Sequence, residues 1–344
     1  IQSGNWNGKQ KGQIMSKFAD IYGHEQIKEH LQNAIRLNKV SHAYIFNGPM
    51  GSGKKMTAGI FAETLQCEQH GQEPCGTCHS CIQSESGNQP DIIWVHHEKP
   101  GSIGVDDVRE QVIGDMQIKP YSSRYKIYII DEAEKLTPQA QNALLKTIEE
   151  PPAYGIIILL TTNADTFLQT ILSRCVRLDF RPLRDTLVTQ YLQEKYDLTD
   201  YECRFATAFA QGKIGRAVTI ATSKEFAQLK EEVMHVIRYA KEMTTAEIMA
   251  EVKNIANYKL TIDDYLDLMA MWYRDVLVFK STKDSNALIF KDEMSLLAEQ
   301  AKNCSYEGLE DILKSIDKVK LRLKANVNFD LVIELLIMAI KEAM

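Results

Sequence analysis

The sequence lacks a long apolar run, an excess of positive charge and a set of cysteines spread along the chain. No apolar run approaches the roughly 20 residues of a membrane span, and no hydrophobic core of a secretory signal is visible. The formal net charge of −6 and the pI of about 5.8 argue against a chain that grips nucleic acid by itself over a broad surface. The seven cysteines are odd in number and mostly clustered, which fits a reduced cytosolic protein with a metal site better than a disulfide framework.

Length and composition are those of an ordinary globular protein. The 344 residues are enough for two or three domains, and 44% hydrophobic with 25% charged residues is typical of a folded chain. Residues 1–14 are rich in Gly, Asn, Gln and Lys and have no periodicity. We therefore expect a disordered leader over residues 1–15.

The most informative stretch lies at residues 43–55. Residues 43–47 predict a short buried strand, residues 48–54 give the spacing G-x-x-x-x-G-K, and helical spacing continues over residues 57–65. This is the context of a phosphate-binding loop, because glycines let backbone N–H groups turn toward phosphate oxygens. Gly48, Gly51 and Gly53 are expected to shape the loop, and Lys54 to supply a mobile cation.

The position after Lys54 departs from this pattern. A Ser or Thr hydroxyl at this position ligates Mg²⁺, whereas Lys55 cannot ligate a metal and brings a positive charge to where one would sit. The loop is therefore expected to hold phosphate but to be poorly built to hydrolyse it. The alternative is a glycine-rich turn that binds no ligand.

A group of four cysteines follows the helix of the loop. Cys67, Cys75, Cys78 and Cys81 have the spacing C-x7-C-x2-C-x2-C, in a loop rich in Gly, Pro, Glu and His. Two overlapping C-x-x-C steps let four thiolates converge on one tetrahedral ion, which indicates a closed, structural Zn²⁺ site. His79 is expected to be a surface residue. The alternative is a set of free surface thiols.

Two further strand ends carry polar residues. Residues 126–130 predict a buried strand that ends at Asp131 and Glu132, where the first acid would hold the Mg²⁺ shell and the second would polarise a water. Residues 155–160 predict a central parallel strand, after which Asn163 would face the same crevice as Lys54 and Asp131. Without the upstream loop, the two acids would be ordinary solvated carboxylates.

The rest of the pattern gives the fold class. Strands are also expected at residues 91–96 and 176–180, with helices at 25–37, 105–116, 137–149 and 167–172. From Pro182 onward only helices are expected, at about 185–195, 203–210, 215–222, 226–241, 245–256, 262–278, 291–302, 306–321 and 327–343. Apolar residues of the C-terminal part are expected to make core or subunit contacts, namely Leu266, Leu268, Met269, Trp272 and Val276. The prediction is an α/β P-loop parallel sheet with a zinc-binding insertion, followed by a small helical unit and a separate all-helical C-terminal domain.

At this point a family resemblance can be stated, from about residue 16 to the end of the chain. The chain resembles the bacterial clamp loader of DNA polymerase III, which belongs to the AAA+ ATPase superfamily. The four-cysteine insertion and six short motifs carry the resemblance: residues 41–44 (Ser-His-Ala-Tyr), 87–91 (Gly-Asn-Gln-Pro-Asp), 131–136 (Asp-Glu-Ala-Glu-Lys-Leu), 142–146 (Asn-Ala-Leu-Leu-Lys), 149–152 (Glu-Glu-Pro-Pro) and 173–175 (Ser-Arg-Cys).

The resemblance implies roles for two residues that carry no signal alone. Asn163 corresponds to the sensor of the γ-phosphate. Arg174 corresponds to the arginine finger, which acts in trans on ATP bound by a neighbouring subunit and can be worth ~10³–10⁵ in rate.

Three departures separate this chain from the motor subunits of the family. The motors keep a Thr where this chain has Lys55, and they carry a sensor arginine where this chain has Gly215, with Arg216 one step late. The chain also stops at residue 344, without the long extension of a tau-type subunit. All three departures predict a stator, an accessory subunit whose own ATPase activity is absent or weak, although Lys54, Asp131 and Glu132 are intact.

The resemblance implies three domains and a set of partners. Residues 16–181 are expected to form the nucleotide-binding-type domain with the zinc module, residues 182–224 the helical lid, and residues 225–344 the oligomerising collar. The stator would assemble with delta and tau/gamma subunits in a hetero-pentamer, help to load the sliding clamp on primed DNA, and donate Arg174 to a neighbouring ATPase site. Structural Zn²⁺ and ATP or ADP bound without turnover are the expected cofactors, and the expected location is the cytoplasmic, nucleoid-associated replisome, with no membrane partner.

Two other functions stay open from the residues. The chain could be an active ATP-hydrolysing motor of the tau/gamma type, with Mg²⁺-dependent turnover that disappears in Lys54→Ala. It could also be a zinc-dependent DNA-binding module with the P-loop fold as a scaffold, against which the net charge of −6 argues.

Overall fold

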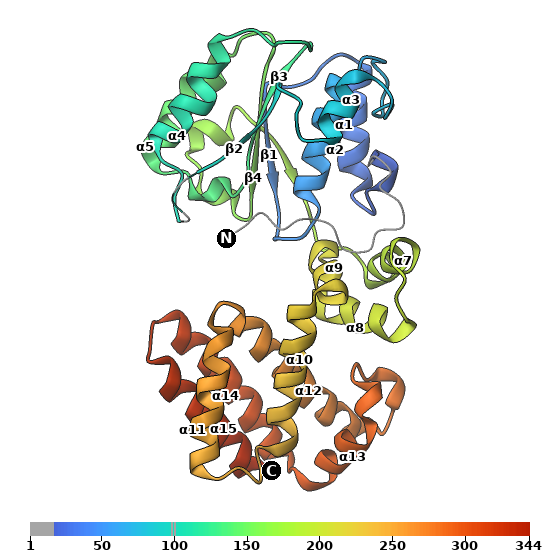
Figure 1. Ribbon diagram of the computed structural model, residues 1–344, viewed down its shortest axis with the longest axis vertical. Coiled ribbons are helices and arrows are strands. Elements are labelled where there is room, and N and C mark those ends of the chain that lie inside the picture. Colours follow the sequence, from blue (N-terminus) through green and yellow to red (C-terminus); the bar gives the residue numbers. More distant parts are fainter. Residues whose placement is uncertain (1–16, 98, 100) are drawn as a thin grey trace. The chain divides into compact units, whose positions relative to one another are not determined.

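The computed structural model describes residues 17–97, 99 and 101–344 (Figure 1). The expected leader, residues 1–15, lies outside the described residues. Contacts divide the chain into two compact units, one with residues up to 198 and 210–218, the other with residues 199–209 and 219–344. The helices of the expected lid thus contribute to both units, and the three-domain division remains a proposal.

A parallel sheet of five strands forms the centre of the first unit. In space the order is β2-β3-β4-β1-β5, and every pair of neighbours is parallel. The strands are β1 (Ala43–Asn47), β2 (Ile92–Val95), β3 (Lys126–Ile130), β4 (Gly155–Thr161) and β5 (Val176–Asp179). The central strands β3 and β4 are buried along their whole length, as their continuous apolar runs predict.

Side chains alternate between the two faces of the sheet and build two apolar cores. On one face, Ile45, Tyr128 and Leu159 pack with apolar residues of α4 (Val105–Val108) and α5 (Pro138–Glu149). On the other face, Tyr44, Phe46 and Ile158 pack with α1 (Glu25–Arg36) and α2 (Lys54–Gln66). Figure 1 shows these two helical layers on either side of the strands. In the central strands β3 and β4, this three-layer arrangement covers both faces, so the polar residues that follow them lie at the ends of the strands.

The helix expected over residues 105–116 has a different geometry. Helix α4 continues as a π-helical segment, Arg109–Gly114, and then as a 3-10 turn, Asp115–Gln117. The Asp115 carboxylate accepts hydrogen bonds from Tyr128 Oη at 2.9 Å and pairs with Lys126 Nζ at 2.9 Å, so β3 anchors the last turn. Such a tertiary anchor has no local sequence signal.

The remaining helices of the first unit are short. They are α3 (His79–Glu85), which lies within the segment expected to be a loop, α6 (Gln169–Leu172) and α7 (Asp185–Lys195). Helix α5 is capped at its start by Thr137, whose Oγ1 accepts from the backbone N–H of Ala140 at 3.2 Å.

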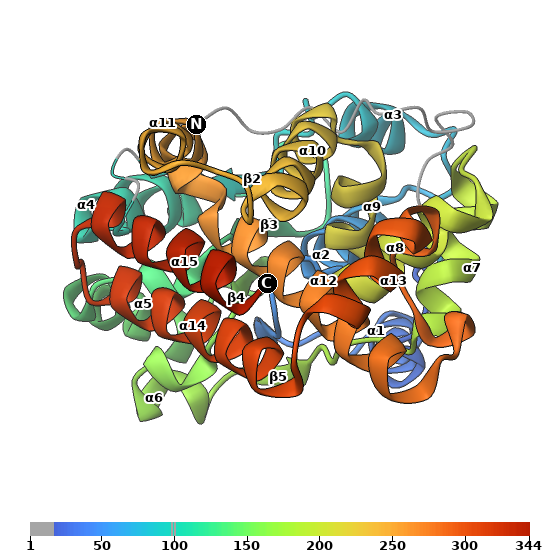
Figure 2. The same ribbon diagram turned by 90° about the horizontal axis from the view of Figure 1, so that it is seen from below.

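Helices alone make up the second unit and the link to it. They are α8 (Asp200–Ala210), α9 (Ile214–Thr222), α10 (Lys224–Tyr239), α11 (Thr245–Ile255), α12 (Ile262–Thr282), α13 (Met294–Asn303), α14 (Tyr306–Lys324) and α15 (Phe329–Ala343). Within this unit α14 and α15 lie side by side (Figure 2). Trp272 is fully buried, and its Nε1 donates to Gln300 Oε1 at 2.8 Å. The apolar residues predicted for this core, Leu266, Leu268, Met269, Trp272 and Val276, are all buried.

These elements confirm the predicted fold class, a P-loop parallel sheet with a cysteine insertion followed by helices. Among the described residues, no helix is both long enough and apolar enough to span a membrane.

Candidate functional site

The glycine loop connects β1 to α2 at the carboxyl edge of the sheet. Gly51 and Gly53 have φ angles of +77° and +93°, a conformation that glycine adopts without strain. At Gly48 the backbone passes so close to β5 that a Cβ atom would lie 2.4 Å from the carbonyl oxygen of Phe180. The loop therefore needs glycine at residues 51 and 53 for its turn geometry, and at residue 48 for close packing against the backbone of Phe180.

Lys54 is turned into the loop. Its Nζ donates to the carbonyl oxygen of Gly48 at 2.5 Å and to that of Pro49 at 2.8 Å, and the residue is buried. Burial lowers the pKa of Lys54, while the carboxylates of Glu134 and Asp131 act in the opposite direction. Two backbone carbonyls thus hold the ammonium where phosphate oxygens could replace them.

Lys55 and Asp131 form an ion pair at the same edge. Lys55 Nζ lies 3.3 Å from Asp131 Oδ2, and the two side chains are 58% and 42% exposed. The ammonium also lies 5.2 Å from the centre of the Trp94 ring. The carboxylate expected in a metal shell is therefore engaged by the lysine that replaces the metal-binding hydroxyl.

The other two expected nucleotide residues are held by local contacts. Glu132 has a left-handed backbone (φ +50°), and its Oε2 lies 2.7 Å from Lys135 Nζ and 3.6 Å from His97 Nε2. Asn163 follows β4 as expected, but its Oδ1 accepts from the backbone N–H of Asp165 at 3.0 Å and caps a short turn. Their roles as water-polarising acid and phosphate sensor remain predictions.

One acid that was given no role in the sequence lies at this site. Glu134 accepts from Thr162, at 2.7 Å from Oγ1 and at 3.2 Å from the backbone N–H. Burial raises the pKa of Glu134, but the hydrogen bonds from Thr162 and neighbouring groups outweigh it and hold the pKa below its usual value. The signal that could have found Glu134 is its place in the acidic run after β3.

Gly215, where the resemblance places a sensor arginine in the motor subunits, lies directly against the loop. The backbone N–H of Gly215 donates to the carbonyl oxygen of Gly51 at 2.8 Å. A Cβ atom on Gly215 would lie 3.0 Å from Gly51 Cα, which is tighter than ordinary packing allows. The first turn of α9 therefore lies against the loop, backbone to backbone, and leaves little room for a side chain at residue 215.

Arg174 lies near the amino ends of the strands, at the opposite end of the sheet from the glycine loop. It follows α6 and precedes β5, so it is near the amino end of a strand, whereas Lys54, Asp131 and Asn163 follow the carboxyl ends. A five-residue strand such as β1 is roughly 16 Å long, which separates the two edges. Arg174 Nη2 lies 3.0 Å from Glu149 Oε1, and the arginine side chain is 41% exposed. The guanidinium is thus outward-facing and distant from the loop of its own chain.

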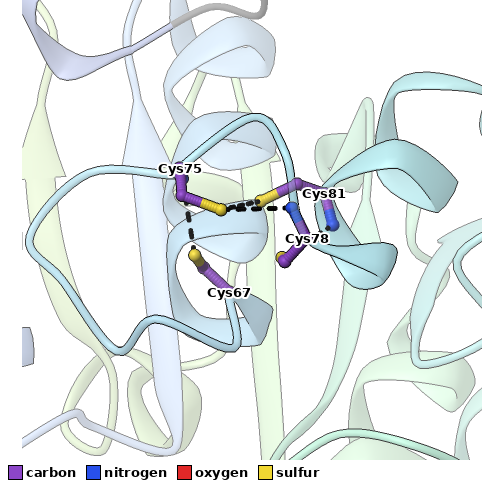
Figure 3. A group of neighbouring side chains, drawn as sticks. All are labelled: Cys67, Cys75, Cys78 and Cys81. Carbon is purple, nitrogen blue, oxygen red and sulfur yellow. Dashed lines mark hydrogen bonds between the residues drawn. The ribbon is translucent and has the colours of Figure 1, made fainter.

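The four cysteines converge, as Figure 3 shows. Their sulfur atoms all lie within 4.8 Å of one another, and the Cys75 and Cys81 sulfurs are 3.9 Å apart. A tetrahedral zinc site with Zn–S bonds of about 2.3 Å requires sulfurs about 3.8 Å apart. The cluster can therefore hold a metal ion with four thiolates.

Backbone N–H groups point at these sulfurs. Cys75 Sγ accepts from the N–H and the hydroxyl of Thr77 and from the N–H of Cys78, and these hydrogen bonds lower the pKa of Cys75 to about 6. Burial raises the pKa of the Cys67 and Cys81 thiols. Cys78 Sγ caps α3 by accepting from the N–H of Cys81 at 3.4 Å, and His79 is exposed, as expected. A cation among the sulfurs would favour the thiolate form of all four.

The cysteine segment is also tied to the start of the described chain. Glu73, between the first two cysteines, accepts from the backbone N–H of Phe18 at 2.7 Å and from Gln32 Nε2 at 3.0 Å. Phe18 is buried in the core that covers β1. Glu73 therefore connects the cysteine module to α1 and to the described residues just before that helix.

Fold and site together define a P-loop protein with a cysteine module, whose own loop carries a lysine in place of a metal ligand. Comparisons with known proteins agree. Residues 23–184 match the family "DNA polymerase III, delta subunit", and residues 224–342 match "DNA polymerase III, delta subunit, C terminal". The chain therefore belongs to this family of DNA polymerase III clamp-loader subunits, which confirms the resemblance seen in the motifs.

Individual relatives include both subunit types that the motifs distinguish. The delta-prime subunit of Bacillus subtilis is 29% identical over 91% of this chain and 94% of its own length. The tau subunit of the same bacterium is 30% identical over 88% of this chain, but only 58% of its own length is covered. Among solved structures, a gamma-subunit-related protein of Thermotoga maritima aligns with 91% of this chain and 99% of its own, at 18% identity and a TM-score of 0.47.

Proposed function

We propose that the chain is the delta-prime stator of a bacterial clamp loader. It helps to place the sliding clamp on primed DNA. It also donates Arg174 to the ATP site of a neighbouring subunit, where the arginine assists hydrolysis. The observation that carries this proposal is the separation of two sites on one sheet. Arg174 faces outward at one edge, while the loop at the other edge has Lys55 paired with Asp131 where a motor would hold Mg²⁺.

The test is a reconstituted clamp loader that carries Arg174→Ala. ATP turnover at the neighbouring site is expected to fall by roughly 10³–10⁵-fold, because the guanidinium stabilises charge that develops on the transferred phosphoryl group. Steady-state, DNA-stimulated hydrolysis and clamp loading are measured. Arg36→Ala is the control, because Arg36 is an exposed arginine at the end of α1 whose Nη2 donates to Asn33 Oδ1, three residues before it. Full hydrolysis and loading by the Arg174→Ala complex would contradict the proposal.

We also propose that the glycine loop of this chain binds ATP or ADP without turnover. Gly48, Gly51, Gly53 and Lys54 form the phosphate cradle, with Lys55, Asp131, Glu132 and Asn163 around it. The intact Lys54 and the strand-end acids favour one rival, an active tau/gamma-type motor. That rival requires Mg²⁺-dependent hydrolysis by the isolated chain that Lys54→Ala abolishes.

The metal of the cysteine module is proposed to be structural Zn²⁺, held by Cys67, Cys75, Cys78 and Cys81. Four sulfur ligands leave no open position for catalysis, and soft thiolates favour zinc over oxygen-preferring ions. About one zinc per chain is expected in freshly purified protein.

The helical part after residue 224 is proposed to be the collar that assembles with delta and tau/gamma subunits in a hetero-pentamer. Apolar side chains remain exposed on α14, α15 and the turn between them, namely Leu321, Val327, Leu331 and Leu335, at 69%, 41%, 52% and 45%. Leu331 and Leu335 lie one helical turn apart on α15, as on a packing face. The location proposed is the cytoplasmic, nucleoid-associated replisome, where the assembled complex meets the clamp and primed DNA.

A further inference from the structure

We propose that the Lys55 ammonium takes the place of the divalent cation, so that the loop binds the phosphates of a nucleoside di- or triphosphate without Mg²⁺. This inference rests on the proposed binding of nucleotide by this chain. It is independent of the role of Arg174, which lies at the other edge of the sheet.

The residues at the loop do not fit Mg²⁺. The ion requires oxygen ligands in near-octahedral geometry, and a P-loop supplies one from the residue after the lysine. Here that residue is Lys55, whose ammonium has three donors and no acceptor. The second expected ligand, Asp131, has Oδ2 3.3 Å from Lys55 Nζ, and its Oδ1 accepts from the N–H of Glu132 at 3.0 Å. A divalent ion there would meet a like charge and a carboxylate already engaged on both oxygens.

The same arrangement fits an ammonium in the role of the metal. Asp131 on one side and the Trp94 ring, 5.2 Å away, hold Lys55 Nζ at the strand ends without burying it, since its side chain is 58% exposed. An ammonium has three donors, so those that Asp131 does not use are left for a phosphate oxygen. Because Lys55 and Asp131 neutralise each other, Lys54 and the backbone N–H groups of the loop supply the net attraction for phosphate.

The charge count predicts which form of the nucleotide binds. A P-loop with a hydroxyl ligand gains two positive charges when Mg²⁺ enters with the nucleotide. In this chain the Lys55 ammonium is a permanent part of helix α2 and is already paired with Asp131, so no metal has to enter with the nucleotide, and the metal-free form should bind as well as the Mg²⁺ complex.

Titration of the full chain with ADP and with ATP tests the inference, by calorimetry in Mg²⁺ and again in EDTA. The wild-type Kd should agree within about twofold between the two conditions, whereas Lys55→Thr should bind at least about tenfold more tightly in Mg²⁺ than in EDTA. Lys39→Thr is the control, since Lys39 is an exposed lysine outside the loop. Thermal denaturation of each variant establishes that it is folded.

Either of two results would overturn the inference. One is a wild-type affinity that falls tenfold or more in EDTA, and the other is no binding of either nucleotide under either condition. The second result would leave the Arg174 experiment unaffected, and loss of the Arg174 effect would leave the metal-free binding unaffected. The two proposals therefore fail separately.

Discussion

Helix α2 begins at one site and ends at another, and the two differ in how complete they are: the first lacks one residue of its motif, whereas the second has all four of its expected ligands. At its first turn, the phosphate loop keeps its glycines and Lys54, but its metal ligand is replaced by Lys55. Just beyond its last turn, Cys67 begins a module in which all four expected ligands lie within 4.8 Å. A phosphate loop can thus keep its backbone geometry while one side chain alters its expected chemistry, whereas a four-thiolate metal site needs all four of its ligands.

The largest effect is expected from a substitution that disrupts the cysteine module. Cys67→Ser should lose the bound zinc and on the order of 5 kcal/mol of stability, because metal binding and folding of such a module are coupled. Zinc analysis and urea denaturation measure the two changes. Cys304→Ser, at a buried cysteine outside the module, is the control and should keep the zinc. A Cys67→Ser chain that retains metal and stability would show that Cys67 is not one of the metal ligands.

A smaller effect concerns Glu63, a partly buried acid of α2 between the two sites. Burial, and to a lesser extent the carboxylate of Glu85, raise the pKa of Glu63 to about 7 from a usual value near 4.5. Because the folded-state pKa is the higher one, the stabilisation is complete below about pH 4.5 and is lost as the pH rises through 7.

Glu63→Gln removes this dependence. The variant should be more stable than wild type by about 1–3 kcal/mol at pH 8, with the difference shrinking toward pH 5. Urea denaturation at the two pH values measures it. A difference that is the same at both values would mean that Glu63 titrates as an exposed acid.

The smallest effect is expected from a substitution that tests how closely α9 packs against the glycine loop. Gly215→Ala places a Cβ atom 3.0 Å from Gly51 Cα and should cost about 1 kcal/mol, after the gain in helix propensity is subtracted. Gly59→Ala in α2 is the matched control, since its Cβ would meet only the Trp94 ring at 4.0 Å. Thermal denaturation compares the two. Equal stabilisation by both substitutions would mean that α9 does not lie tightly against the loop.

Much of this architecture could be predicted from local pattern. The strand at residues 43–47 and the helix at residues 185–195 have the predicted bounds, and the four cysteines converge as their spacing indicated. Apolar runs and C-x-x-C steps are local signals, so a single sequence contains them.

The contacts that explain the site could not be predicted in the same way. Three of them join residues far apart in the chain: Lys55 with Asp131, Gly51 with Gly215, and Glu134 with Thr162. Helix α3 was also missed, because its first turn lies among cysteines that suggested a loop. Such contacts depend on which strand ends meet at one edge of the sheet, and the strand order is known only from the fold.

The most direct test of the central claim is steady-state ATP hydrolysis by the purified chain alone, with Mg²⁺ and primed DNA. We predict that the rate of ATP hydrolysis does not exceed background and is the same for wild type and Lys54→Ala, because Lys55 occupies the position at which a motor subunit binds its metal. Mg²⁺-dependent hydrolysis that Lys54→Ala abolishes would contradict it and would make this chain a motor.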